Sequence, residues 1–190
     1  MASILKLPQD KLDAVLAEAG QGEVVTAANF NSPDQVVIAG HAAAVQRAGE
    51  LAKAAGAKRV VPLPVSAPFH CPLMKPAQDR MAKELAAVSF SDLHCPLINN
   101  WRAREIRSGD EAREGFIEQI PNPVRWTQTI QYLASQGVTE TVEVGPGAVL
   151  TGLVRSIAPD IKGQKFGEAS DLEKFSTVTV VGSPAHGERS

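Results

Sequence analysis

One histidine of the chain, His70, occupies a position where an imidazole could do acid–base chemistry. It lies in a loop at residues 66–75, stiffened by Pro68 and Pro72, directly after an expected strand. Loops at strand ends are where α/β proteins place catalytic groups, and histidine is the most frequent general acid or base. By spacing alone, a loop histidine with a structural role is slightly favoured, so both interpretations stay open at this point.

The other candidate groups carry weaker signals. Three further histidines open a helix or stand in polar or terminal stretches, and we interpret them as surface or capping residues: His41, His94 and His186. The two cysteines, Cys71 and Cys95, give neither a disulfide framework nor metal-ligand spacing, so we predict no metal site. A nucleophilic Cys71 is a weak alternative, because adjacent side chains on an extended loop point apart.

Apolar periodicity in residues 1–65 predicts elements in the order β-α-β-β-α-β. Their expected ranges are residues 2–7, 8–20, 23–31, 35–39, 41–55 and 58–65. The turn residues Ser32, Pro33 and Asp34 join the middle strands into a hairpin, and Gly20 and Gly56 are expected to end the helices. This order is that of the split βαβ, or ferredoxin-like, unit.

Residues 66–172 have a different pattern, in which strands and helices alternate. The expected strands are residues 95–100 and 138–144, and the expected helices are residues 76–88, 110–120, 126–136 and 148–157. Such alternation is typical of a parallel sheet with helices on its faces. Two strands are too few to bury both faces, so we expect only part of a sheet. The stretch from Pro159 is polar and expected to be loose, and residues 173–190 are expected to form a flexible tail.

Composition narrows the classes of partner. A net charge of −2 gives no basic field for nucleic acid, and no apolar run is long enough to span a bilayer. The first seven residues lack the basic flank and long apolar core of a signal peptide. We therefore predict a soluble, cytoplasmic protein that binds neither nucleic acid nor membrane.

Several short blocks, in order and at matching spacings, resemble the bacterial malonyl-CoA:acyl-carrier-protein transacylases. The blocks are NFNSP (29–33), QVVIAG (35–40), PLPVS (62–66), FHC (69–71), LM (73–74), NN (99–100), NPV (122–124) with Trp126, EVGPG (143–147) and LTGL (150–153). The resemblance runs from Met1 to about Leu172. It implies an α/β (α+β) fold: a ferredoxin-like small subdomain at residues 1–65, then the C-terminal part of an α/β-hydrolase-like acyltransferase subdomain at residues 66–172.

The resemblance also implies roles for single residues. His70 would be the general base that activates a serine and the general acid for the departing thiol. Gln119 would orient His70 through its backbone carbonyl. Asn29 and Asn31 would lie near the acyl pocket, although asparagines also suit a hairpin. Phe69 would exclude a branched methylmalonyl group, unless it is a core aromatic.

The nucleophile of the family is not found in the sequence. The family carries its serine in a Gly-His-Ser-x-Gly elbow, and no Gly-x-Ser-x-Gly occurs in the 190 residues. The family's malonyl-binding arginine is also missing. We therefore expect a chain that corresponds to the C-terminal part, as a fragment, truncated product or half of a split enzyme, and that is inactive without a complementing N-terminal polypeptide. Apolar faces of the helices at 76–88 and 148–157 are expected to lie exposed.

Two functions remain in competition. The first is malonyl transfer from malonyl-CoA to acyl carrier protein in fatty-acid biosynthesis, with no cofactor beyond these substrates. The second is a non-catalytic module that binds acyl carrier protein or a partner acyltransferase. Carrier proteins are acidic, so Lys53, Lys58 and Arg59 are possible contacts, although a solvated basic face is the simpler interpretation.

Overall fold

The structure is a computed structural model that describes residues 1–175. Its first part contains four strands and two helices, in the β-α-β-β-α-β order expected from the sequence. They are β1 (Ala2–Leu5), α1 (Leu12–Gly20), β2 (Val25–Ser32), β3 (Gln35–Gly40), α2 (Ala42–Ala54) and β4 (Arg59–Pro62). A short 3-10 helix, η1 (Gln9–Lys11), leads into α1.

These strands form one antiparallel sheet in the order β2-β3-β1-β4. The first strand is central, because Ala2 pairs with Ile38 of β3 on one side and with Pro62 of β4 on the other. The predicted hairpin joins β2 to β3, and Ser32 pairs with Gln35 across its turn. Register shifts in β2 occur beside Asn29 and just before Ser32, so this strand is irregular where the sequence places its asparagines.

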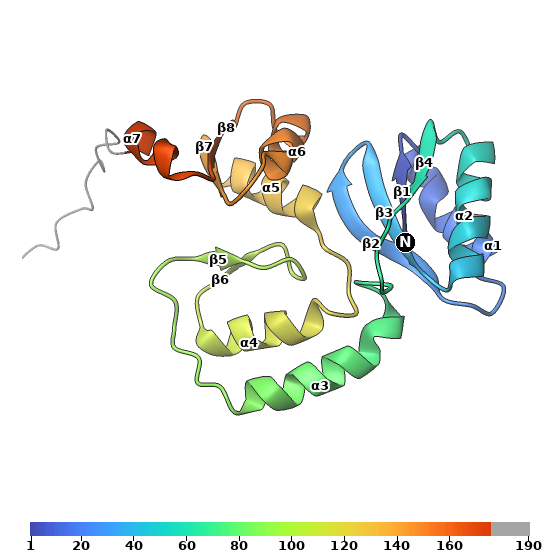
Figure 1. Ribbon diagram of the computed structural model, residues 1–190, viewed down its shortest axis with the longest axis horizontal. Helices are drawn as coiled ribbons and strands as arrows, with labels where there is room; N and C mark the ends of the chain where they lie inside the picture. The colour runs from blue at the N-terminus through green and yellow to red at the C-terminus, as the bar shows by residue number, and fades with distance from the viewer. Residues whose placement is uncertain (176–190) are drawn as a thin grey trace, which may run out of the picture.

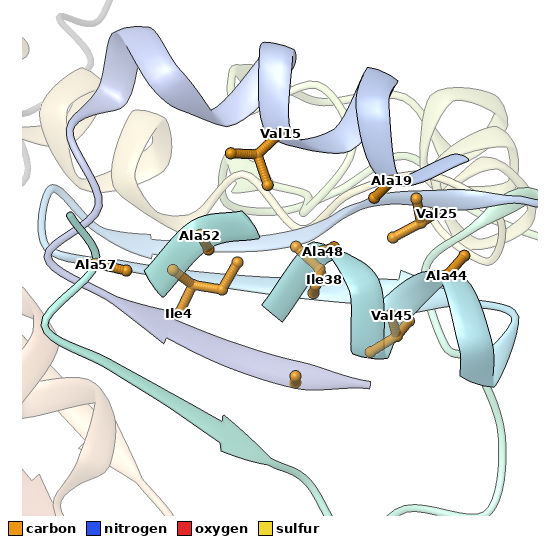
Figure 2. Packing of buried hydrophobic residues seen from close by; sticks show 11 residues of the cluster. Ile4, Val15, Ala19, Val25, Ile38, Ala44, Val45, Ala48, Ala52 and Ala57 are labelled. Atoms are coloured by element: carbon orange, nitrogen blue, oxygen red, sulfur yellow. The ribbon is translucent and has the colours of Figure 1, made fainter. Parts of the chain in front are cut away.

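The core of the first part lies between α1, α2 and one face of the sheet (Figure 2). Small side chains of α2 at a four-residue spacing, Ala44, Ala48 and Ala52, are fully buried, which lets this helix approach the sheet closely. Ile4 and Ile38 supply the larger side chains beneath them.

Helix ends follow the prediction with one refinement. The first helix ends at Gly20 as expected, but the left-handed residues are the next two, Gln21 (φ 46°) and Gly22 (φ 87°). Gly56 (φ 105°) follows α2 as expected. His41 precedes α2, and its Nδ1 accepts a hydrogen bond from the Val24 backbone N–H at 2.9 Å, so this histidine ties the start of α2 to the residue before β2.

The second part contains helices and two separate two-stranded sheets (Figure 1). Its elements are η2 (Pro72–Met74), α3 (Lys75–Ala86), β5 (Leu97–Ile98), β6 (Glu105–Ile106), α4 (Gly109–Glu118), α5 (Trp126–Ser135), β7 (Glu140–Val144), α6 (Val149–Ile157), β8 (Lys162–Phe166), η3 (Ala169–Asp171) and α7 (Leu172–Phe175). Most of the predicted tail, residues 176–190, lies outside the described residues.

Two strands were missed by the sequence pattern. β6 pairs antiparallel with β5, which is shorter than the strand expected at 95–100. β8 pairs parallel with β7 in the stretch from Pro159 that was expected to be loose, so that expectation is wrong. The reason is that β8 is polar and largely exposed, so backbone pairing with β7 defines it and no apolar alternation marks it.

As far as the described residues extend, large apolar side chains are exposed only after β4, the last strand of the first part. All of them lie at position 65 or beyond: Val65, Phe69, Met81, Val88, Leu97, Phe116, Val142, Val144, Val149, Leu150 and Leu172. Val144 and Val149 are the most open, at 78% and 71% exposure, and they stand on either side of the β7–α6 loop. Exposed apolar faces were expected on the helices at 76–88 and 148–157. In the structure, α3 exposes Met81, and α6 exposes Val149 and Leu150. Within residues 1–175, no helix is both long enough and apolar enough to cross a bilayer.

A glutamate caps the helix that follows β7. The Glu143 carboxylate accepts hydrogen bonds from the Leu150 N–H at 3.0 Å, the Thr151 N–H at 2.7 Å and the Thr151 hydroxyl at 2.8 Å. Gly145 (φ 135°) and Gly147 (φ 92°) supply the turn that brings the strand end to the helix start. The hydrogen bond from the Thr151 N–H lowers the pKa of Glu143 most, and the Thr151 hydroxyl and the Leu150 N–H add to this effect, because all three donors favour the ionised carboxylate.

This cap predicts a pH-dependent effect of Glu143→Gln. A carboxyl with a lowered folded pKa stabilises the fold fully above its ordinary value of about 4.3 and loses that contribution as the pH falls through the folded value. We expect the variant to have a lower urea midpoint than the parent near neutral pH, with a gap that closes in acid. Glu140→Gln, on the same strand without a capping contact, is the matched control. A gap that stays constant between neutral pH and roughly pH 3 would contradict the cap.

Candidate active site

His70 lies on a loop that is fixed to the sheet by the next residue. Cys71 is fully buried and packs with Ala28, Val37 and Ala39, on the face of the sheet opposite the two helices. Its Sγ donates a hydrogen bond to the Pro68 carbonyl at 3.1 Å, which closes the loop around His70. Cys71 is buried in the core and His70 is only half-buried, so Cys71 holds the backbone of His70 in place.

The backbone of His70 is in the left-handed region, with φ 57°. Few residues other than glycine adopt this conformation, although histidine does so more often than most, and such positions concentrate at functional sites. His70 is half-buried, and its Nδ1 lies 2.8 Å from the backbone carbonyl of Gln119. This is the contact that the resemblance predicts.

The contact sets the tautomer of the ring. A carbonyl oxygen accepts only, so Nδ1 must carry the proton that it shares with Gln119. In the neutral ring, Nε2 is then unprotonated and available as a proton acceptor. The arrangement is therefore that of a histidine prepared to act as a general base, and the catalytic roles of His70 and Gln119 stay predictions.

Gln119 directly follows α4, and several contacts fix that helix. The Ser108 hydroxyl accepts from the Glu111 N–H at 3.2 Å and caps its start. Near its end, a side chain on Gly115 would collide with the amide of Asn99, so α4 lies directly against the first residue of the NN block. The end of α4, and with it the acceptor for His70, is placed by packing that the sequence pattern did not reveal.

A short extended segment joins the second part of the chain to β2. The Val124 N–H donates to the Ala28 carbonyl and the Phe30 N–H donates to the Val124 carbonyl, both at 2.9 Å, so that Asn29 and Val124 form a parallel bridge. The Thr127 hydroxyl adds a hydrogen bond to the Phe30 carbonyl at 2.9 Å. This segment comes only a few residues after Gln119, and it explains how the NPV block and the asparagine hairpin come together.

The remaining predicted residues have different positions. Asn29 lies on the strand that receives the extended segment, whereas Asn31 is half-buried and Phe69 is 40% exposed. Within the part of the chain that the structure describes, neither asparagine side chain makes a hydrogen bond to His70. Their pocket roles and that of Phe69 therefore stay predictions. A cavity of about 420 Å³ lies elsewhere, between the hairpin turn and the start of α5, and His70 does not line it.

A comparison with known proteins decides the family. The acyl transferase domain family matches residues 9–186. The chain belongs to this family. The acyl transferase domain is 48% identical over 172 residues to the malonyl CoA-acyl carrier protein transacylase of Escherichia coli K12, covering 90% of this chain and 56% of the relative. The corresponding Bacillus subtilis protein is 42% identical over 174 residues, covering 91% of this chain and 55% of the relative. The resemblance read from the motifs is thus confirmed.

Solved structures agree with the sequences. An acyl carrier protein S-malonyltransferase from Vibrio cholerae superposes with a TM-score of 0.88 at 44% identity, covering 92% of the domain and 57% of that structure. A malonyl-transacylase in complex with a type II PKS acyl-carrier protein superposes with a TM-score of 0.88 at 42% identity, covering 91% and 56%. The mixed α/β fold is therefore that of acyltransferases, and the domain spans little more than half the length of the relatives it matches.

The environment of Cys71 argues against a cysteine nucleophile. Burial raises the pKa of the Cys71 thiol, which keeps it protonated and unreactive, and its side chain is fully enclosed. Cys95 is exposed and serves as an internal control.

We therefore predict that a thiol reagent at neutral pH modifies Cys95 quickly and Cys71 only after unfolding. Mass spectrometry of labelled peptides, with and without denaturant, measures both rates in one sample. Equal rates for the two cysteines in the folded chain would contradict the buried position of Cys71.

Proposed function

We propose that the domain takes part in malonyl transfer from malonyl-CoA to acyl carrier protein, in fatty-acid biosynthesis, as the part of a transacylase that carries the catalytic histidine. The observation that carries the proposal is the 2.8 Å contact between His70 Nδ1 and the Gln119 carbonyl. It leaves Nε2 free in a family whose relatives are malonyl transacylases. Asn29, Asn31 and Phe69 are proposed to shape the acyl pocket beside it.

In the proposed reaction, Nε2 of His70 takes the proton of a serine hydroxyl as its oxygen attacks the malonyl thioester carbonyl. The carbon–sulfur bond then breaks, and the imidazolium gives its proton to the departing coenzyme A thiolate. In the second half, the same nitrogen takes the proton of the phosphopantetheine thiol, which attacks the malonyl-serine ester. The carbon–oxygen bond of the ester then breaks, and His70 gives that proton to the departing serine oxygen, so the ring ends as it began.

The serine of this reaction is proposed to come from residues outside this sequence, on the same polypeptide or on a separate one. The 190 residues contain no Gly-x-Ser-x-Gly, and the relatives are much longer than the matched region. The exposed apolar side chains at position 65 and beyond, above all Val142 and Val144 of β7, would receive the complementing polypeptide.

The finer organisation belongs to the same proposal. Residues 1–65 would be the ferredoxin-like subdomain, residues 66–172 part of an α/β-hydrolase-like subdomain, and residues 173–190 a tail. The sheet order β2-β3-β1-β4 with two helices on one face supports the first of these assignments. We also infer that the reaction needs no cofactor beyond its two substrates, and that it takes place in the cytoplasm.

The function is tested by joining the domain to the unmatched part of the Escherichia coli relative, which is expected to carry the serine elbow. The domain by itself should transfer no malonyl group to acyl carrier protein, whereas the chimera should transfer it. His70→Ala in the chimera should lower the rate by about 10²- to 10⁴-fold, the contribution of a general base. Radiolabelled malonyl-CoA and gel analysis of the carrier protein give the measurement.

His94→Ala is the matched control for this experiment, because His94 is exposed and distant in sequence from the loop. Its chimera should keep the parental rate. Transfer by the isolated domain at a similar rate would show that the proposed division of labour is wrong. A chimera that is indifferent to His70→Ala would refute the role of the histidine.

A second candidate function is a non-catalytic module that binds acyl carrier protein or a partner acyltransferase. It is supported by the structural relative that was solved with its acyl-carrier protein. Lys53, Lys58 and Arg59 are exposed and lie close together in sequence near the end of α2 and the start of β4. None of the three forms an ion pair within residues 1–175, so they are available to an acidic partner.

For this second function, we predict that carrier protein added to the ¹⁵N-labelled domain shifts amide resonances around Lys58 and Arg59. Charge reversal in Lys58→Glu with Arg59→Glu should weaken binding, and more strongly at low salt, because the contact is electrostatic. Lys162→Glu, on β8 and away from this surface in Figure 1, should bind like the parent. Unshifted resonances at millimolar carrier protein would remove this function.

A further inference from the structure

Gln119 is held from two sides. Its backbone carbonyl accepts from His70 Nδ1 at 2.8 Å, and its side-chain oxygen Oε1 accepts from the Nδ2 amide of Asn100 at 3.0 Å. Asn100 is itself fixed, because its backbone carbonyl accepts from the Arg125 N–H at 3.0 Å. Gln119 is thus tied through Asn100 to Arg125, the residue that follows Val124, and Val124 pairs with β2.

Neighbouring contacts fix the preceding residue instead. Gln78, the one buried residue of α3, donates from Nε2 to Glu118 Oε1 at 3.0 Å. The Asn122 amide donates to the Glu118 backbone carbonyl at 2.7 Å. These bonds place the end of α4, but neither of them reaches Gln119. Within the described residues, the side chain of Gln119 has one hydrogen-bond partner, Asn100.

The tether has a reason in the chemistry of helix ends. The last carbonyls of a helix have no partner within the helix and are free to turn toward water. The Gln119 carbonyl stands just beyond α4 and is in this position. A bond at its side chain restricts the rotation of the residue and so the direction in which the carbonyl points.

We propose that Asn100 is a positioning residue: through the side chain of Gln119 it aims the Gln119 carbonyl at His70 and thereby holds His70 in the tautomer with its proton on Nδ1. Asn100 touches neither substrate nor the reacting atoms, and it acts only through Gln119. The consequence for malonyl transfer rests on the proposed function, whereas the effect on the tautomer does not.

The test observes the ring of His70 directly. In the full chain with ¹⁵N-labelled histidine, the nitrogen shifts of the neutral ring distinguish a protonated from an unprotonated nitrogen. The parent should show a protonated Nδ1 and an unprotonated Nε2 at His70. In Asn100→Ala and in Gln119→Ala, which keeps the backbone carbonyl, both shifts should move toward the average of a ring that exchanges between tautomers.

Three further variants separate aiming from general support. The double variant N100A/Q119A should show the same shift as each single variant, because each substitution removes the same hydrogen bond between Asn100 and Gln119. Asn100→Asp should restore the parental shifts, because the Gln119 amide can turn and donate to the new carboxylate. Gln46→Ala, which removes an exposed amide contact on α2, should leave His70 unchanged. Circular dichroism confirms that each variant is folded.

The inference is overturned if folded Asn100→Ala keeps the parental His70 shifts, if the two single effects add, or if Asn100→Asp resembles Asn100→Ala. In the chimera, kcat/KM should fall about two- to tenfold in Asn100→Ala, as expected for the loss of one hydrogen bond. A chimera without activity would count against the proposed function but not against the tautomer result. An active chimera, together with His70 shifts that do not change in Asn100→Ala, would support the proposed function and count against the positioning role of Asn100.

Discussion

The hydrogen bond between His70 Nδ1 and the Gln119 carbonyl joins residues 49 positions apart, and each side of it depends on a different region of the fold. The histidine side depends on the four-stranded sheet, because Cys71 is buried against Ala28 and Val37 and fixes the loop. The carbonyl side depends on the end of α4 and on its neighbours. The extended segment at Val124 connects the two sides, since it pairs with β2 a few residues after Gln119. A displacement on either side would change the direction of the bond before it changed the overall fold.

The two parts of the chain differ in how they bury apolar surface. The first part has a closed core between two helices and a sheet, in which Ile4, Ile38 and three alanines of α2 (Ala44, Ala48 and Ala52) are buried. The second part has a small cluster around Ile130, Val154 and Ile161, while Val144 and Val149 remain largely exposed. The candidate active site lies where the two parts meet. Its histidine side rests against the sheet of the first part, because Cys71 packs on that sheet. The exposed apolar side chains of the second part are proposed to receive the complementing polypeptide.

The strength of the local signal decided what could be predicted from the sequence. The elements of residues 1–65 follow clear apolar periods, and their order and hairpin were predicted correctly. β6 and β8 were missed because backbone pairing creates them and their side chains show no apolar alternation. Gln119 emerged only through the family resemblance, because it acts through a backbone carbonyl that every residue type possesses. Asn100 belongs to a recognised block, yet nothing in its residue type distinguishes a tether from an ordinary turn asparagine.

A carbonyl at Nδ1 places a particular demand on the rest of the site. A carboxylate in that place would both orient the ring and stabilise the imidazolium by its charge, whereas a carbonyl carries only a dipole and contributes mainly through direction. Direction is lost by rotation of a single peptide unit, and the peptide after a helix is the least restrained one. A site that uses a helix-end carbonyl therefore needs neighbours that fix that peptide. The amide of Asn100 restrains Gln119 directly, and the amides of Asn122 and Gln78 restrain the residue before it, Glu118.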